Sequence, residues 1–325
     1  MIPTSIRFPP QLALARAVET LPGPDAMPGG RRFEPKWDGI RLAAVADSAI
    51  SLWSRQGTDL TAAFPEIVEA CGQLPTQSLF DGELVLWKDG RLAFEDLLRR
   101  MSSGVRSARR LAREMPASLV LFDVLAIEGV DTRRLAFDER RELLTLALDG
   151  VQPPLSLSPM TADPEEAAAW FEDMAAAGIE GLMVKGGAQP YRPGERDWVK
   201  VKRRETVDVV VAAVIGSIER PQSVVVGLVV DGKLRVAGRS ASLKPAQATQ
   251  LGRLLRPPSG KHPWPEVLPA GGLGRFSARE GPVHLTLVEP VAAEVSADSA
   301  RSRGSFRHSV RFLRLRSDAE LPAFE

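Results

Sequence analysis

The chain has 325 residues, too many for one comfortable hydrophobic core, and this length predicts two domains. Its hydrophobic content of 44% and charged content of 26% are typical of a soluble globular protein, and no apolar run could span a bilayer. A single cysteine, Cys71, excludes an internal disulfide and a cysteine-rich zinc site. Because the N-terminus also lacks the pattern of a secretory signal, a reducing cytoplasm is the simplest expectation.

The net charge of +1 conceals two clusters of arginine. The first precedes Glu114 and consists of Arg99, Arg100, Arg106, Arg109, Arg110 and Arg113. The second consists of Arg301, Arg303, Arg307, Arg311, Arg314 and Arg316. Such runs are often only solvated faces. Two of them on a nearly neutral chain nevertheless favour contact with a phosphate backbone.

Strands and helices alternate in the N-terminal part of the chain. Residues 1–30 are rich in proline and glycine and are expected to cover the surface. Strands are predicted at 32–46, 49–56, 78–87, 118–125, 179–185 and 197–203, with a hairpin turn at Asp47-Ser48. Helices are predicted at 60–74, 138–148 and 164–177, and in the first arginine cluster.

The composition shifts after Glu205. Strand-like segments occur at 207–218, 223–230, 233–239, 282–288, 291–296 and 306–315, with one helical stretch at 243–255. Short strands with one interposed helix suit a small barrel of the OB type. Domains are therefore predicted at 1–204 and 205–325.

The stretch Glu34-Pro35-Lys36-Trp37-Asp38-Gly39-Ile40-Arg41 is interpreted as a strand that turns at Asp-Gly and leaves as a second strand. Strand alternation would then place Lys36 and Asp38 on one face. A lysine amine in an apolar pocket beside other cations can act as a nucleophile. A solvated lysine in an exposed hairpin is the plain alternative, so this interpretation needs partners for Lys36.

Three later strands supply such partners. Lys200 and Lys202 share one strand face, which is electrostatically unfavourable unless an anion binds there. Asp81 and Glu83 likewise lie on one face of an otherwise apolar strand, which favours the lining of a site. Asp123 interrupts an apolar run and is costly unless it is paired or faces a cavity.

In order, the chain carries EPKWDGIR, SRQG, FDGEL, LFDVL, EGLMVK and WVKVK, and its predicted barrel ends in RFLRLRSD. This set resembles the covalent nucleotidyltransferase superfamily, most closely the small bacterial ATP-dependent DNA ligases of the ligase C type, over about residues 30–318. The resemblance implies an α+β fold: an adenylation domain of antiparallel sheets with flanking helices, followed by an OB-fold β-barrel. It also implies that 5′-phosphate/3′-hydroxyl nicks in duplex DNA are sealed through a lysyl-AMP and a DNA-adenylate, in DNA repair.

The resemblance also implies roles for individual residues. Lys36 would be the nucleophile that takes AMP from ATP. Glu34 would read the adenine amino group, and Phe122 would stack on the adenine ring. Arg41 and Arg55 would contact the ribose side of the nucleotide and the DNA phosphate, and Glu83 would bind the ribose or the metal network. Lys200 and Lys202 would grip the α-phosphate. Arg314, Arg316 and Asp318 of the last motif would complete the nucleotide site. Glu180 and Asp38 would hold Mg²⁺ or Mn²⁺.

DNA contact is expected from the two arginine clusters and the barrel surface. With no further DNA-binding domain in this sequence, Arg99, Arg100, Arg106, Arg109 and Arg110 are predicted to give modest, salt-sensitive binding to nicked duplex DNA. The resemblance further predicts a monomer in the bacterial cytoplasm, associated with the nucleoid. A repair polymerase or an end-binding protein is its candidate partner.

Other functions remain open at this point. An RNA ligase or an mRNA-capping guanylyltransferase shares most of these motifs, although EPKWDG and FRHSVRF match bacterial DNA ligases more closely. A non-catalytic nucleotide-binding scaffold is the other alternative. Its one hint is Ala319, which follows Arg316-Ser317-Asp318 where family members often carry a basic residue.

Overall fold

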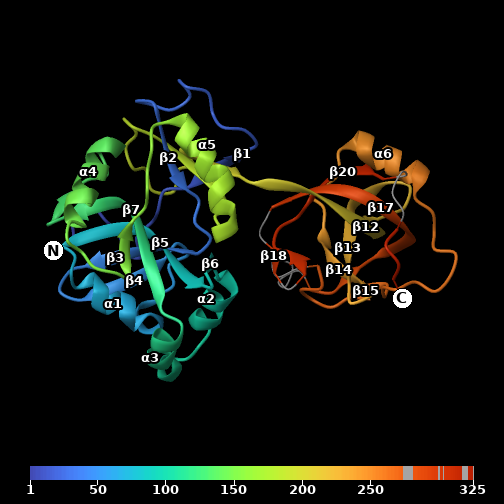
Figure 1. Ribbon diagram of the computed structural model, residues 1–325, viewed down its shortest axis with the longest axis horizontal. Helices are drawn as coiled ribbons and strands as arrows, with labels where there is room; N and C mark the ends of the chain where they lie inside the picture. Colours follow the sequence, from blue (N-terminus) through green and yellow to red (C-terminus); the bar gives the residue numbers. More distant parts are fainter. Residues whose placement is uncertain (274–280, 299–300, 303, 317–320, 325) are drawn as a thin grey trace. The chain divides into compact units, whose positions relative to one another are not determined.

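The computed structural model describes residues 1–325 apart from 274–280, 299–300, 303, 317–320 and 325. The chain divides into two compact units, Met1–Lys202 and Arg203–Glu325. Figure 1 colours the first unit from blue to yellow and the second from yellow to red.

The first unit contains two sheets and several helices. Its strands are β1 (Ala15–Val18), β2 (Arg31–Pro35), β3 (Ile40–Ala46), β4 (Ile50–Ser54), β5 (Ser78–Lys88), β6 (Arg91–Leu92), β7 (Ala117–Ile127), β8 (Val130–Asp131), β9 (Leu155–Leu157), β10 (Gly181–Gly186) and β11 (Trp198–Lys202). Its helices are α1 (Pro65–Cys71), α2 (Phe94–Met101), α3 (Val105–Glu114), α4 (Phe137–Ala147) and α5 (Pro164–Asp173), with 3-10 turns η1 (Thr61–Ala63) and η2 (Met174–Ala177).

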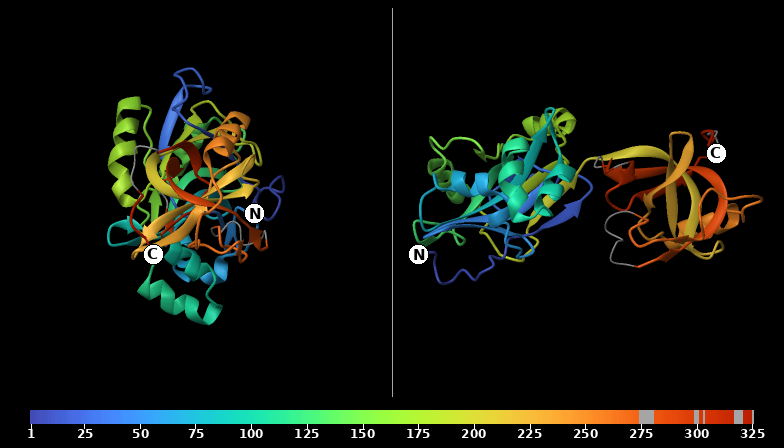
Figure 2. Two further views of the ribbon diagram at one scale, coloured as in Figure 1. Left: turned by 90° about the vertical axis from the view of Figure 1, so that its right-hand side faces the viewer. Right: turned by 90° about the horizontal axis from the view of Figure 1, so that it is seen from below.

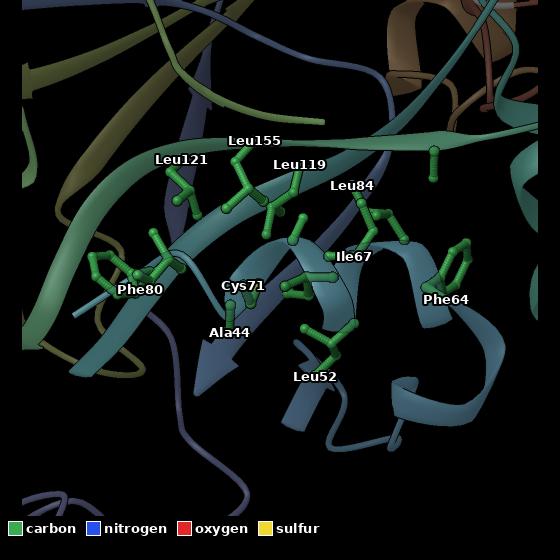
Figure 3. Close-up of a cluster of buried hydrophobic side chains, with 14 of the residues drawn as sticks. Ala44, Leu52, Phe64, Ile67, Cys71, Phe80, Leu84, Leu119, Leu121 and Leu155 are labelled. Carbon is green, nitrogen blue, oxygen red and sulfur yellow. The ribbon is translucent and has the colours of Figure 1, made fainter. Parts of the chain in front are cut away.

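The larger sheet runs in the order β4-β3-β5-β7-β8, with β6 beside β5 and β9 beside β7. Side chains alternate along β3: Leu42 and Ala44 enter the core beneath α1, whereas Ala43 and Val45 enter a second core on the opposite face. Figure 3 shows the first of these cores, where Ile67 of α1 packs under the strands. Because both faces of this sheet are covered, β3 is apolar from Leu42 to Ala46 instead of alternating.

The smaller sheet runs in the order β1-β11-β10-β2. One face packs on α5, where Leu182 and Val184 join Ala167 in a core. The other face packs on the larger sheet, since Trp198 of β11 shares the second core with Val45 and Phe122. Residues on these facing surfaces of the two sheets therefore line the interior of the first unit.

The stretch 34–41 does not form the predicted hairpin. β2 ends at Pro35 in the smaller sheet and β3 begins at Ile40 in the larger one, so residues 36–39 cross between sheets. The backbone of Lys36 still pairs with the start of β10, because its N–H donates to the Gly181 carbonyl at 2.8 Å. The crossing is tight: a Cβ on Gly39 would lie 2.2 Å from the Leu84 carbonyl oxygen.

Two further sequence predictions need correction. Residues 1–30 do not merely cover the surface, because β1 pairs in parallel with β11 and the side chains of Ile2, Ile6 and Leu12 are buried. The helix predicted at 60–74 divides into η1 and α1, and α1 begins at Pro65. Proline favours the first helical position, since its missing N–H would be unpaired there anyway. The helices predicted at 138–148 and 164–177 are confirmed as α4 and as α5 continued by η2.

The second unit is built around one antiparallel sheet in the order β14-β13-β12-β17-β20. Its elements are β12 (Arg204–Gly216), β13 (Pro221–Val230), β14 (Lys233–Arg239), α6 (Pro245–Leu254), β15 (Val267–Leu268), β16 (Val283–His284), β17 (Thr286–Asp298), β18 (Arg301–Ser302), β19 (Ser305–Phe306) and β20 (Arg311–Leu315). The predicted strand at 291–296 is the central part of β17, which continues through Pro290 beside a register shift in β12. A proline within a strand is tolerated at such an irregularity.

The two edges of this sheet approach each other. A bridge pairs Ser240, just after β14, with Val310, just before β20. Figure 2 shows the strands of this unit curving around their core, which includes Val211, Val226 and Phe312.

Candidate active site

Lys36 lies at the point where β2 leaves the smaller sheet, and its amine donates a hydrogen bond to Glu180. The carboxylate of Glu180 is 7% exposed, and Lys202 Nζ lies 3.8 Å from the same oxygen. The register of the strands explains this meeting, because Gly181 of β10 is opposite Lys202 of β11 while its carbonyl accepts from the Lys36 backbone. One nearly buried carboxylate therefore serves two cations.

Cations gather around this point. Lys200 is half-buried, and its pKa is lowered by burial and then by the charges of Lys36, Lys202, Arg55 and Arg196. Arg55 follows β4 of the larger sheet and is exposed, so both sheets contribute positive charge. Cations that repel one another in this way are stabilised when an anion binds among them. The arrangement fits the predicted phosphate site.

Arg41 is held by protein groups on several sides. Its guanidinium donates two hydrogen bonds to Asp81, at 2.9 and 2.6 Å, and one to the Ala13 carbonyl at 2.6 Å. It also lies 4.8 Å from the ring centroid of Trp198 and 5.5 Å from that of Phe122. These contacts fix Arg41 beside the predicted adenine ring partner. Its predicted contact with the ribose stays a prediction.

Glu83 has a strongly altered protonation equilibrium. Burial raises the pKa of its carboxyl group to about 8, although the nearby charges of Lys36 and Arg41 oppose that shift. The neighbouring carboxylates Asp81 and Asp38 reinforce it. Glu83 therefore holds a proton at neutral pH for most of the time and can act as a hydrogen-bond donor or acceptor.

A second ionic group lies at the other end of the site. The carboxylate of Glu34, on β2, is 2.8 Å from Lys185 Nζ and accepts a 3.4 Å hydrogen bond from Arg141 of α4. Lys185 is 1% exposed; its amine donates to the Phe122 carbonyl at 3.1 Å and lies 4.7 Å from the Phe122 ring centroid. The two residues predicted to read adenine, Glu34 and Phe122, are thus linked through one lysine.

Asp123 confirms the expectation that a carboxylate within an apolar strand must be paired. Arg140 of α4 donates to both of its oxygens, at 2.7 and 3.0 Å, and both side chains are fully buried. Sequence reasoning found neither Arg140 nor Arg141 as partners. It also gave no role to Lys185, although this lysine follows an apolar run in the strand that begins after Glu180.

The first arginine cluster separates into exposed and buried members. Arg99 at the end of α2 and Arg106, Arg109 and Arg110 on α3 are exposed, as a DNA contact requires. The prediction for Arg100 is wrong. Its side chain is fully buried and donates to Glu66 and to the carbonyls of Met115 and Ala63, so it stabilises the fold instead of meeting a phosphate.

The last motif lies in the second unit. Arg314 of β20 donates to Glu294 at 2.7 Å, and Arg316 donates to Asp208 at 3.0 Å. Asp318, with Ala319, lies outside the described residues.

Among the described residues, no group of three or more His, Cys, Asp or Glu side chains is close enough to hold a metal ion. Mg²⁺ is usually held by one or two carboxylates together with substrate phosphates and water. Glu180 lies beside Lys36, and the charge of Asp38 acts on Glu83. Their role as metal ligands stays a prediction.

The mixed α+β scaffold and its lysine-centred cation cluster are consistent with a nucleotidyltransferase. Residues 14–202 match the family model for the ATP-dependent DNA ligase domain. The chain is 33% identical over 314 residues to DNA ligase C2 of Mycolicibacterium smegmatis, covering 90% of this chain and 88% of that one. It is 31% identical over 331 residues to DNA ligase C of Mycobacterium tuberculosis, covering 94% and 90%. The chain therefore belongs to the ATP-dependent DNA ligases, which confirms the resemblance drawn from its motifs.

A solved structure of a Lig E DNA ligase agrees with this fold. It has a TM-score of 0.58 at 18% identity, covering 94% of this chain and 99% of that one. No helix in the described part of the chain is long and apolar enough to cross a membrane.

Proposed function

We propose that this ligase seals nicks through an adenylate on Lys36 and that it serves DNA repair. The observation that carries the proposal is the lysine itself: its amine lies on Glu180, with Lys200 and Lys202 on the adjacent strand. A nucleophile that must attack phosphorus needs little beyond positioning and charge neutralisation. In the first step, the Lys36 nitrogen bonds to the α-phosphorus of ATP and the bond to pyrophosphate breaks.

The strand register supports one orientation of ATP. Glu34, Met183 and Lys200 are opposite one another across β2, β10 and β11. Two positions away, Lys202 is opposite Gly181, whose carbonyl accepts from the Lys36 backbone. The phosphates would lie at Lys36, Lys200 and Lys202. The adenine would lie toward Glu34 and the Phe122 ring, with the ribose at Glu83.

A divalent metal would be held by Glu180 and Asp38 together with ATP phosphates, and would neutralise charge on those phosphates. Oxygen ligands accept either Mg²⁺ or Mn²⁺. Because Glu180 already binds the Lys36 amine, its carboxylate would have to share or exchange that partner. Arg41 and Arg55 would complete the cofactor contacts, the latter also at the DNA phosphate.

Two further transfers would complete sealing. AMP would pass from Lys36 to the 5′-phosphate at the nick, and the 3′-hydroxyl would then displace AMP. The exposed arginines of α2 and α3, Arg99, Arg106, Arg109 and Arg110, would bind the duplex through its phosphates. The enzyme would act as a monomer in the bacterial cytoplasm near the nucleoid, with a repair polymerase or end-binding protein as partner.

The proposal assigns residues 1–204 to an adenylation domain and residues 205–325 to an OB-fold domain. The bridge between Ser240 and Val310 supports the second assignment, because it joins the two ends of a five-stranded antiparallel sheet, as a small barrel requires. Arg314 and Arg316, with Asp318, would contact the nucleotide. Glu294 pairs with Arg314 and Asp208 pairs with Arg316, and both acids belong to the second unit.

The test is covalent labelling. Wild-type protein incubated with α-labelled ATP and Mg²⁺ or Mn²⁺ should give a labelled band, and Lys36→Ala should not. Lys88→Ala is the matched control, since its side chain is 62% exposed and its amine pairs with Asp96 instead of Glu180. Sealing of nicked DNA should require the same lysine. Label that survives in Lys36→Ala would overturn the assignment of the nucleophile, and stronger labelling by GTP would favour a capping enzyme.

A further inference from the structure

The carboxylate of Glu34 is enclosed by protein groups. It is 2% exposed, and its two oxygens have different partners: Oε2 faces Lys185 from β10, and Oε1 faces Arg141 from α4. Arg141 is itself anchored, because its other terminal nitrogen donates to the Ser158 carbonyl at 2.5 Å. Two cations from separate elements thus fix one carboxylate.

The protonation state of this carboxylate decides what it can recognise. An ionised carboxylate only accepts hydrogen bonds, whereas a protonated one also donates. Adenine offers an amino donor on its six-membered ring, where hypoxanthine and guanine carry a carbonyl acceptor. An ionised Glu34 would therefore accept from adenine and repel the other two bases, and a protonated Glu34 would tolerate all three.

Burial favours the protonated form of Glu34, which would tolerate all three bases. It raises the pKa of the carboxyl group, and the nearby charge of Asp123 adds to that shift. Lys185 and Arg141 oppose it, by charge and, for Lys185, by a hydrogen bond. Asp123 is the one acid among these neighbours, and it is itself paired with Arg140. The two cations at Glu34 are therefore the charges that favour its ionised, acceptor form.

We infer that Lys185 and Arg141 are positioning residues that set the nucleobase selectivity of the ligase, by holding Glu34 ionised and aimed at the base. Lys185 extends this role to the ring, since it also binds the Phe122 carbonyl and lies over the Phe122 ring. The inference rests on the proposed function, because it needs ATP to enter with its base toward Glu34.

The experiment compares initial rates of lysyl-nucleotide formation with ATP and with ITP, whose base is hypoxanthine. Arg141→Met should raise KM for ATP and leave kcat near the wild-type value, because Arg141 does not touch the reacting atoms. The ATP/ITP ratio of kcat/KM should fall by about tenfold or more, as expected when a site loses a directed hydrogen-bonding group. Arg141→Lys, which keeps the cation, should recover much of the ratio.

Two further variants complete the design. Glu34→Gln, whose amide can donate and accept, should lose the discrimination outright. Arg134→Met removes an exposed arginine and should leave the ratio unchanged. For wild-type protein, the ATP/ITP ratio of kcat/KM should fall as the pH is lowered. In Arg141→Met, the same fall should already begin at a higher pH.

The outcomes are separable. If wild-type protein takes no label from ATP, the proposed function fails. If it takes label and a folded Arg141→Met, checked by circular dichroism, keeps the wild-type ATP/ITP ratio and pH profile, the inference about Glu34 is wrong while the proposed function stands.

Discussion

The ion pair between Asp123 and Arg140 offers a sharp test of the packing beneath the site. Both side chains are fully buried, and Arg140 also donates to the carbonyls of Leu135 and Gln189. Asp123→Asn keeps the shape and removes the charge, which leaves Arg140 and the nearby Lys185 as buried cations with less compensation. Breaking one partner of a buried pair typically costs about 3–5 kcal/mol. For a unit of this size, the corresponding fall in Tm is roughly 6–20 °C.

The assay is thermal unfolding followed by circular dichroism at neutral pH. Asp131→Asn is the matched control, because its pair with Arg133 is partly exposed, at 28% and 20%. Exposed pairs contribute about 1 kcal/mol or less, so this variant should shift Tm far less. Replacing both buried partners, as in Asp123→Leu with Arg140→Met, should recover part of the loss. Equal Tm shifts for Asp123→Asn and Asp131→Asn would refute the reasoning.

Other changes have distinct expected outcomes. Because the folded pKa of Glu83 is about 8, well above its ordinary 4.5, the folded protein holds a proton that the unfolded chain releases, and stability should fall as pH rises through that window. Glu83→Gln should flatten this fall in urea titrations at several pH values; an unchanged slope would contradict it. Lys202→Ala should abolish most ATP labelling, whereas Arg106→Ala should spare labelling and weaken DNA binding in a salt-dependent way; equal effects in both assays would count against the division of roles. Gly181→Ala should block labelling, since its φ is +149° and a Cβ would lie 2.0 Å from the Val201 carbonyl oxygen, whereas Gly23→Ala, in open space, should be silent.

The sequence predicted what depends on local pattern. Strand β5 and helices α4 and α5 were found because periodicity and capping residues specify them within a short window. The face shared by Lys200 and Lys202 was also correct, since alternation in β11 requires only the strand itself.

What the sequence could not supply was pairing over long distances. Residues 36–39 look like a hairpin turn locally, and only the choice of different partner strands for β2 and β3 makes them a crossing between sheets. Arg100 carries the same signal as its exposed neighbours, and only its contact with Glu66 on α1 shows it to be structural. Arg141 of α4 reaches Glu34 of β2 although the two residues are far apart in the sequence, and no local pattern predicts that contact.

The spacing of Glu34 and Lys36 joins recognition to chemistry. The two residues lie two positions apart on a segment that pairs with β10, so they share a face and lie about 7 Å apart along it. Glu34 meets Lys185 near the Phe122 ring, and Lys36 meets Glu180 near Lys202. If the proposal is right, one strand fixes the base and the α-phosphate relative to each other. A single residue inserted between them would turn one of the two side chains to the opposite face, so no loop adjustment elsewhere could restore both contacts at once.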